Sequence, residues 1–216
     1  HFQAVKVIRF SPDGQTVVSG AADALVKVWS WSKLLLAPST GTLEALYTFS
    51  QHSAPITDLV LSLCTIGSTR GRLLSASLDG KCNLYDLVDG QLLLNLSFPC
   101  EITAVAMNAQ ETCIFAAGIN GNIYPCQLNG SSSSNTPAAL QFHKGPISSL
   151  KWSLDERVLI SAGLEDGHLG FWDPFSCQLL KGLQLSSKKV SCTNLLVVGK
   201  SDPSHSDHLS ISSPSA

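Results

Sequence analysis

The chain has 216 residues, of which 44% are hydrophobic and 14% charged, and its formal net charge at pH 7 is −2. This length and apolar content can supply a buried core and exclude a chain that is disordered throughout. Lys and Arg are not concentrated in any segment, which argues against the phosphate-neutralising surface of a direct nucleic-acid binder. No apolar run is long enough to cross a membrane. We therefore expect neither nucleic acid nor a membrane as a direct partner.

The first expected repeat, about residues 1–49, consists of short strands separated by turns. Strands are predicted over 5–10, 16–19, 25–29 and 44–49. The turn Ser11-Pro12-Asp13-Gly14 has Pro and Gly where turn geometry favours them. Residues 31–42 are more than a hairpin needs, so they are interpreted as a loop insertion or as one short helical turn.

The second and third expected repeats follow the same plan. The second, about 50–98, has predicted strands near 56–63, 72–76, 81–86 and 91–98, with Asp89-Gly90 as a strong hairpin turn. The third, about 99–142, starts its first strand at Ile102. It contains a polar Asn, Gly and Ser segment over 129–135, which cannot bury apolar surface and is expected to be a mobile surface loop.

The fourth expected repeat covers about 143–184, and residues 185–198 are interpreted as the stub of a fifth, with its first strand over 190–198. Residues 199–216 are a low-complexity Ser, Pro, His and Asp tail. The chain starts at His1 rather than Met, and four repeats with a stub are few for a radial array. We therefore expect a sequence truncated at both ends.

The cysteines and the histidines of the tail are candidates for metal or redox chemistry. The seven cysteines are odd in number and form no Cys-x-x-Cys pair, so they are expected to be reduced, buried thiols of a nuclear or cytosolic protein. His205 and His208 have a spacing that could serve a metal on a helix, but their Ser, Asp and Pro surroundings favour a solvated tail. We expect no metal and no cofactor.

One motif recurs in all four repeats, at intervals of about 40 to 56 residues. A run of small residues precedes an Asp or Asn in a turn, and an aromatic residue or its substitute follows six positions later. In three copies, a histidine lies roughly 20 to 30 residues before the turn Asp. Self-similarity at this period is typical of radial β-repeats.

Ser, His and Asp together also raise the hypothesis of a hydrolase. A catalytic triad occurs once per active site and needs oxyanion donors and a nucleophile elbow such as Gly-x-Ser-x-Gly, which this sequence lacks. Here the three residue types recur with the period of the strands. We therefore expect a structural role, no catalytic residues and no enzymatic activity.

The Asp-x5-Trp spacing, the upstream His and the Ser-Gly or Ser-Ala run resemble a WD-repeat β-propeller over about residues 1–198. The resemblance implies an all-β fold with four repeats and the first strand of a fifth. It also implies a hydrogen-bond network in which the turn Asp accepts from His, the His meets a Ser hydroxyl, and that hydroxyl meets the Trp indole N–H. The network residues are His1, Ser19, Asp23 and Trp29 in the first repeat, His52, Ser75, Asp79 and Tyr85 in the second, and His143, Ser161, Asp166 and Trp172 in the fourth.

The copies differ in how complete this network can be. In the third repeat Asn120 replaces Asp, Cys126 replaces Trp, Ala116 replaces Ser and no His is present, so this repeat is expected to rely on packing alone. In the second, the Tyr hydroxyl could replace the indole. In the fourth, one extra residue in the turn leaves open whether Ser161 reaches the network.

Four segments, 51–59, 74–82, 89–94 and 102–107, make the chain similar to WD-repeat subunits of the nucleolar complex that processes ribosomal RNA and matures the large ribosomal subunit. Plant members are the root initiation defective proteins. The resemblance implies a non-enzymatic scaffold of the nucleolus and nucleoplasm that binds a solenoid subunit and an armadillo-like subunit. It also implies a homodimer, although the C-terminal helical segment for this is not in the sequence. The alternative is a WD-repeat adaptor for chromatin, replication licensing or ubiquitin-ligase substrates.

Overall fold

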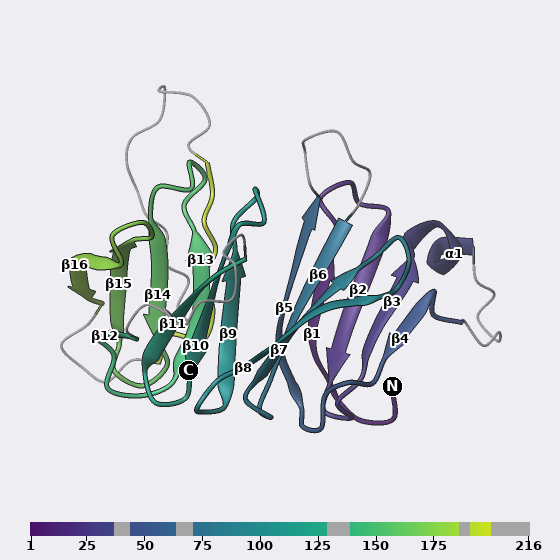
Figure 1. The fold of residues 1–216 in the computed structure, drawn as a ribbon, viewed down its shortest axis with the longest axis horizontal. Coiled ribbons are helices and arrows are strands. Elements are labelled where there is room, and N and C mark those ends of the chain that lie inside the picture. Colours follow the sequence, from purple (N-terminus) through teal and green to yellow (C-terminus); the bar gives the residue numbers. More distant parts are fainter. Residues whose placement is uncertain (37–43, 64–70, 129–138, 186–190, 200–216) are drawn as a thin grey trace, which may run out of the picture.

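The structure, a computed structural model, describes residues 1–36, 44–63, 71–128, 139–185 and 191–199. These residues form sixteen strands and one short helix, arranged as four antiparallel four-stranded sheets (Figure 1). The predicted all-β class is confirmed. No helix in the described ranges is long and apolar enough to span a membrane.

Each sheet is built from four strands that are consecutive in the chain. The first contains β1 (Val5–Phe10), β2 (Thr16–Ala21), β3 (Val26–Ser30) and β4 (Tyr47–Phe49), with helix α1 (Trp31–Leu36) between the last two. The second contains β5 (Ile56–Leu63), β6 (Gly71–Ser77), β7 (Lys81–Asp86) and β8 (Leu92–Ser97). The third contains β9 (Ile102–Met107), β10 (Cys113–Gly118), β11 (Asn122–Gln127) and β12 (Leu140–Gln141). The fourth contains β13 (Ile147–Trp152), β14 (Leu159–Gly163), β15 (His168–Asp173) and β16 (Gln178–Gln184).

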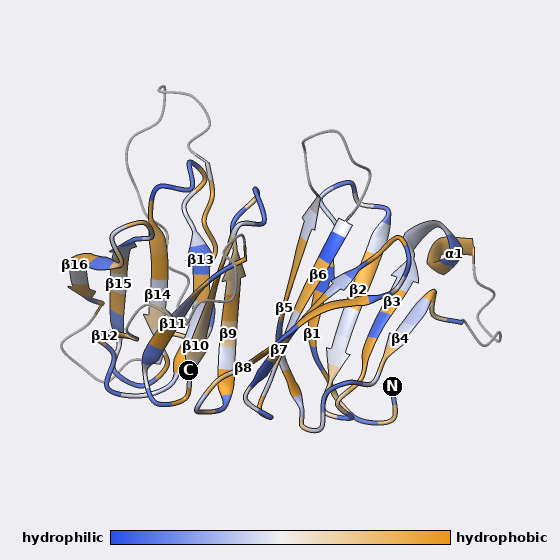
Figure 2. Cartoon of the chain, viewed as in Figure 1, coloured by the Kyte–Doolittle hydropathy of each residue, from blue (hydrophilic) through white to orange (hydrophobic). Residues whose placement is uncertain are grey.

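The first strands of the four sheets, β1, β5, β9 and β13, lie next to one another in chain order. In the third and fourth sheets burial falls from the inner to the outermost strand: β9 is buried along nearly its whole length, whereas every residue of β16 is exposed. The inner strand β1 of the first sheet differs, since only Val7 is buried in it. An apolar run fits a strand that is covered on both faces, as in the largely hydrophobic β9, and Figure 2 shows hydrophilic residues gathered in the turns. The sheets therefore radiate from a shared centre, as the blades of a propeller do.

Three apolar clusters fill the spaces between neighbouring sheets. Val18, Val28 and Phe49 of the first sheet pack with Leu59 and Tyr85 of the second. Similar clusters join the second sheet to the third around Leu74 and Val105, and the third to the fourth around Phe115 and Leu150. Each blade therefore depends on its neighbours for burial of its faces.

In every sheet the pairing of the first two strands has a one-residue register shift near the start of the first strand. In two sheets the residue at this shift directs a hydroxyl towards the next sheet. Thr57 lies at the shift between β5 and β6, and its Oγ1 donates to the carbonyl oxygen of Ile102 at 2.9 Å. Thr103 occupies the same place in the third sheet and donates to the carbonyl oxygen of Ile147 at 2.6 Å. These irregularities thus tie consecutive inner strands together.

The strand expected over 190–198 is not formed: residues 191–199 have no regular secondary structure. This segment lies near β13, since Thr193 and Asn194 line the same cavity as Ser148 and Ser149. A strand needs a ladder partner for its backbone groups, and no further strand follows within the described part of the chain. The helical alternative for 31–42 is correct for α1, while residues 37–42, the polar loop 129–135 and both tail histidines lie outside the described residues.

Candidate functional site

In the first sheet four side chains link the turn between β2 and β3 to the segment that precedes β1. His1 Nδ1 lies 3.1 Å from the Asp23 carboxylate, and His1 Nε2 lies 2.8 Å from Ser19 Oγ. The Trp29 indole N–H donates to the same hydroxyl at 2.9 Å. The carboxylate also accepts the backbone N–H of Phe2 at 2.9 Å. The structure therefore brings all four sequence-derived residues of this repeat into one cluster.

The fourth sheet repeats this geometry despite its longer turn. His143 lies 2.9 Å from Asp166 Oδ2 and 2.8 Å from Ser161 Oγ, and Trp172 Nε1 donates to that hydroxyl at 2.9 Å. Ser161 stays in register because it pairs with Gly170 inside the ladder between β14 and β15. The extra residue is accommodated in the turn beyond the ladder, so it does not displace the hydroxyl.

In the second sheet no aromatic side chain of the described residues donates to the Ser hydroxyl, in contrast to the Trp indoles of the first and fourth sheets. His52 lies 3.0 Å from Asp79 Oδ2 and 2.7 Å from Ser75 Oγ. The Tyr85 hydroxyl instead donates to Gln51 Oε1 at 3.2 Å, so Tyr85 does not extend the chain from Ser75. Asn83 Nδ2 lies 3.2 Å from His52 Nε2. Asn83 was not among the network residues predicted from the sequence, although a polar residue inside a mostly apolar strand is a signal that could have identified it.

We call these three clusters the His–Asp networks, and burial and hydrogen bonding set the charge state of the two in the second and fourth sheets. Burial lowers the pKa of His52 and His143 against the opposing effect of the neighbouring carboxylates, so neutral imidazole is favoured. Burial alone would raise the pKa of Asp79 and Asp166, but hydrogen bonds from backbone N–H groups and from the histidines lower it overall. Neutral His then donates Nδ1–H to the carboxylate and accepts the Ser hydroxyl at Nε2.

The His–Asp networks are poorly placed for catalysis. Ser75 and Ser161, the only nucleophiles in two of them, have 0% exposed surface. A substrate carbonyl cannot approach a hydroxyl that is covered and already bonded to His and Trp or Asn. Their contacts instead fix each turn to the segment that enters the sheet. Among the described residues no group of three or more His, Cys, Asp and Glu is placed to hold a metal.

The third sheet lacks a His–Asp network but does not rely on packing alone. Asn120 Nδ2 donates to the Tyr124 hydroxyl at 2.9 Å, and Cys100 Sγ lies 3.6 Å from that oxygen. The Phe98 ring lies 5.7 Å from the Tyr124 ring. Tyr124 pairs with Ala116, the position that carries Ser in the other sheets. The expectation for this repeat was therefore wrong, because a tyrosine on the neighbouring strand supplies the missing hydroxyl.

Charged side chains connect the inner strands and the turns of neighbouring sheets. Arg9 Nη2 of β1 contacts Asp58 Oδ1 of β5 at 2.8 Å, and Asp58 Oδ2 accepts the N–H of Val105 in β9 at 3.3 Å. Arg72 contacts the buried Glu111 of the next sheet at 3.0 Å. Both arginines are therefore neutralised by carboxylates of the neighbouring sheets.

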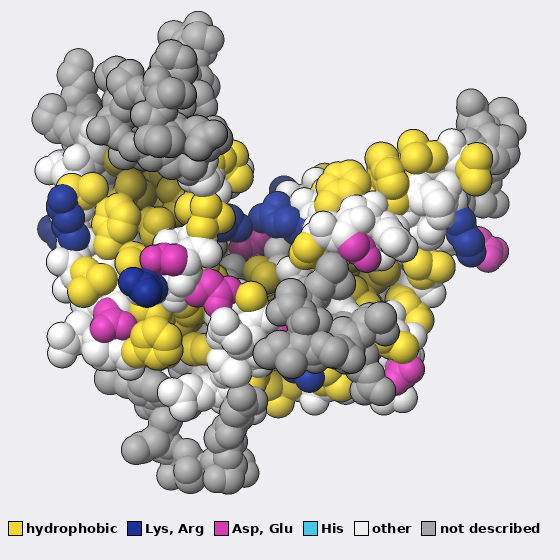
Figure 3. All heavy atoms as spheres, turned by 90° about the horizontal axis from the view of Figure 1, so that it is seen from above, with side chains coloured by type: hydrophobic (Ala, Val, Ile, Leu, Met, Phe, Trp, Pro, Cys, Tyr) yellow, Lys and Arg dark blue, Asp and Glu magenta, His cyan; other side chains and the backbone are white. Residues whose placement is uncertain are grey.

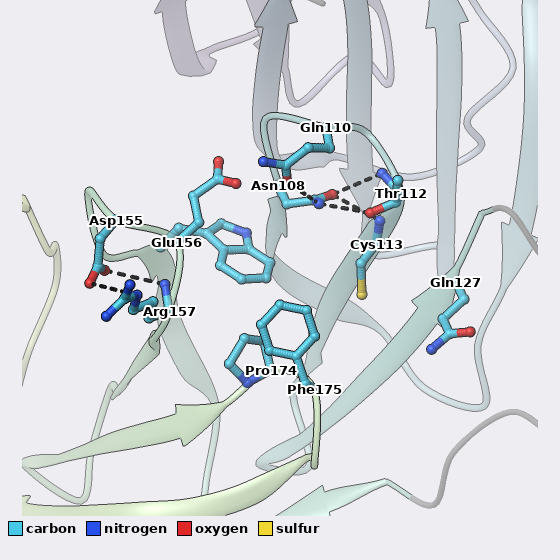
Figure 4. A pocket seen from close by; sticks show the side chains of 11 residues that line it. Asn108, Gln110, Thr112, Cys113, Gln127, Asp155, Glu156, Arg157, Pro174 and Phe175 are labelled. Carbon is cyan, nitrogen blue, oxygen red and sulfur yellow. Dashed lines mark hydrogen bonds and ion pairs between the residues drawn. The ribbon is translucent and has the colours of Figure 1, made fainter.

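The face opposite the His–Asp networks, at the top of Figure 1, carries a groove of about 670 Å³ between the third and fourth sheets. The turns between β9 and β10, β13 and β14, and β15 and β16 form its walls. Figure 3 shows this face, where hydrophobic side chains lie beside acidic and basic ones. The groove is lined by Asn108, Gln110, Thr112, Cys113, Gln127, Trp152, Asp155, Glu156, Arg157, Pro174 and Phe175 (Figure 4). Loops on a rigid scaffold commonly carry binding functions, so this face is the candidate interaction surface.

Comparison with known families gives one match. Residues 1–30, 43–86 and 135–173, more than half of the chain, match the family described as WD domain, G-beta repeat. The first range ends with β3, the middle one covers β4 to β7, and the last one covers β12 of the third sheet and β13 to β15 of the fourth. The degenerate third sheet lies almost wholly outside the matched ranges, in agreement with its different polar interior.

Individual relatives were also found among curated proteins. The chain is 32% identical to WD repeat-containing protein 18 of Rattus norvegicus over 194 residues, which cover 86% of this chain and 44% of that protein. It is 29% identical to Protein ROOT INITIATION DEFECTIVE 3 of Arabidopsis thaliana, covering 98% of this chain and 49% of that protein. It is 25% identical to Pre-rRNA-processing protein crb3/ipi3 of Schizosaccharomyces pombe, covering 85% and 49%. The chain spans about half the length of the curated relatives it matches.

Proposed function

Because the chain belongs to the WD-repeat family, we propose that it is a non-enzymatic protein-interaction scaffold in ribosomal RNA processing and large ribosomal subunit maturation. The observation that carries this proposal is the extent of the similarity. A relative that is named a pre-rRNA-processing protein is similar along 85% of this chain, which is far more than the short motifs that many propellers share.

The polar interior supports a binding role over a catalytic one. The recurring Ser, His and Asp side chains make buried structural contacts with one another and are not free to act on a substrate. Turns on a rigid propeller offer surfaces that partners can recognise without any chemical step.

The proposed partners are protein subunits of a pre-ribosomal maturation complex, namely a solenoid subunit and an armadillo-like subunit. A homodimer would form through a segment outside this chain. The proposed location is the nucleus, in the nucleolus and nucleoplasm. Contact with RNA is assigned to partners, because the net charge is −2 and the cations Arg9 and Arg72 are already paired.

Depletion of the protein, followed by probing of ribosomal RNA precursors, tests this function. We expect spacer-containing precursors of the large subunit to accumulate while the small-subunit pathway is spared. Co-purification should recover a solenoid partner together with large-subunit precursor RNA. Normal processing would overturn the proposal, and recovery of a replication-licensing or cullin complex without ribosomal proteins would favour the adaptor alternative.

A further inference from the structure

The groove between the third and fourth sheets contains a carboxylate whose charge is not neutralised. Glu156 Oε1 accepts the backbone N–H of Ala109 at 2.7 Å, which links the two turns that form the walls. Glu156 Oε2 is buried and has no hydrogen-bond partner, and no cation pairs with Glu156 among the described residues. A buried carboxylate oxygen without a donor is unfavourable, so the site would gain from a cationic donor supplied from outside.

The neighbouring arginine does not fulfil this role. Arg157 lies 3.9 Å from Asp155, and its side chain is 84% exposed, so these two exposed charges largely balance each other. Glu156 itself has a φ of 56°, in the left-handed region that few residues other than glycine adopt. The backbone thus holds this carboxylate towards the neighbouring turn at a local conformational cost.

Aromatic and apolar surface lies beside the carboxylate. Phe175 is 87% exposed, and Figure 4 shows Phe175 and Pro174 below Glu156, on the opposite side of the groove from Gln110. Trp152 also lines the groove, and its indole N–H is buried without an acceptor in the described structure. Planar cations stack on aromatic rings, so this surface suits a planar cation such as a guanidinium.

We propose that this groove binds an arginine side chain from an extended segment of a partner protein. The guanidinium donates to Glu156 Oε2 after a rotation of the carboxylate, and the aliphatic stem packs on Pro174 and Phe175. Trp152, whose indole N–H is buried, lines the groove beside the bound segment. The inference rests on the scaffold part of the proposed function and not on the ribosomal process.

Fluorine NMR of the complete natural protein, labelled with 5-fluorotryptophan, tests the proposal. The Trp152 resonance is assigned by its loss in Trp152→Phe. The probes are the peptide acetyl-Gly-Ser-Leu-Arg-Leu-Ser-Gly-amide and its citrulline twin, which keeps the shape and removes the charge. We expect the Arg peptide to shift the resonance, with roughly five- to tenfold weaker binding of the citrulline peptide, because a charge-assisted hydrogen bond is lost.

Glu156→Gln keeps the Ala109 contact and removes only the charge, so it should weaken the Arg peptide by the same factor and leave the citrulline peptide unchanged. Glu165→Gln is the matched control, since Glu165 is an exposed carboxylate in the turn between β14 and β15 on the other face. Equal affinities of the two peptides, or a resonance that moves only with a single-stranded RNA oligonucleotide, would overturn the proposal. Peptide binding together with normal ribosomal RNA processing would reject the proposed role in that process and support the arginine-binding groove.

Discussion

The second and third sheets share one strand plan but secure the same turn with different chemistry. In the second, His52, four residues before the first strand, joins the turn residue Asp79 to Ser75 within the sheet. In the third, Phe98 holds the equivalent position and packs against Tyr124, which accepts a hydrogen bond from the turn residue Asn120. The turn must be attached to the entering segment, but a charged network is not the only way to attach it.

The two solutions differ in what is lost when a member is removed. The His–Asp network places a carboxylate and an imidazole at side-chain exposures of 4% and 1%, so an abandoned partner remains away from water. The contact between Asn120 and Tyr124 is neutral and exposed, so water can replace either partner. We therefore expect the His–Asp networks to be sensitive to single substitutions and the third sheet to be tolerant.

The largest effect is expected for His143→Ala in the fourth sheet. The side chain is fully buried, and its loss leaves the Asp166 carboxylate and the Ser161 hydroxyl without their shared partner. The free energy of unfolding of the complete protein should fall by about 3 kcal/mol in chemical denaturation. Lys144→Ala, at the exposed neighbouring position, serves as the control and should change it by about 0.5 kcal/mol at most. A loss for His143→Ala no greater than for this control would reject the network as a source of stability.

The next prediction compares the two turns directly. Asp79→Ala should lower the free energy of unfolding by about 1–3 kcal/mol, because His52 loses its acceptor and the backbone N–H groups of Ser53 and Lys81 lose theirs. Asn120→Ala should cost less than about 1 kcal/mol, since only neutral, exposed contacts are lost. Equal losses at the two positions would show that the sheets do not differ as proposed.

The sequence was sufficient where local signals determine the structure. The predicted strand ranges 56–63 and 81–86 match β5 and β7, because turn residues bound each of these apolar runs on at least one side. The sequence was insufficient where two strands must be aligned. Tyr124 acts across the ladder from Ala116, so its role depends on a register that the spacing within one strand does not reveal. The groove was missed for a similar reason, since its walls come from three turns distant in sequence.

Lowering the pH should destabilise the second and fourth sheets relative to the third. This effect should be smaller than the effect of removing the carboxylate. The pKa of His52 and of His143 is lowered in the folded protein, so their contribution is complete above the ordinary value of 6.5 and is lost as the pH falls through the folded value. Protonated His still donates to the carboxylate, and only the contact with Ser must reverse. Hydrogen exchange, corrected for intrinsic rates, should show less protection at pH 5.5 than at pH 7.5 in β6 and β14. A drop of the same size in β10 would contradict this assignment.

The smallest effect is expected for Tyr124→Phe, which removes the hydroxyl that accepts from Asn120 and keeps the ring against Phe98. The free energy of unfolding should fall by about 0.5–1 kcal/mol, the net value of one neutral hydrogen bond. Asn120→Ala combined with Tyr124→Phe should cost little more than either change alone, because both remove the same contact. Tyr85→Phe is the matched change in the second sheet, and it should also be small because that hydroxyl bonds to Gln51 and lies outside the His–Asp network. A loss of about 2 kcal/mol or more for Tyr85→Phe would place Tyr85 in the network after all, whereas additive losses at Asn120 and Tyr124 would mean that the third sheet secures its turn by packing.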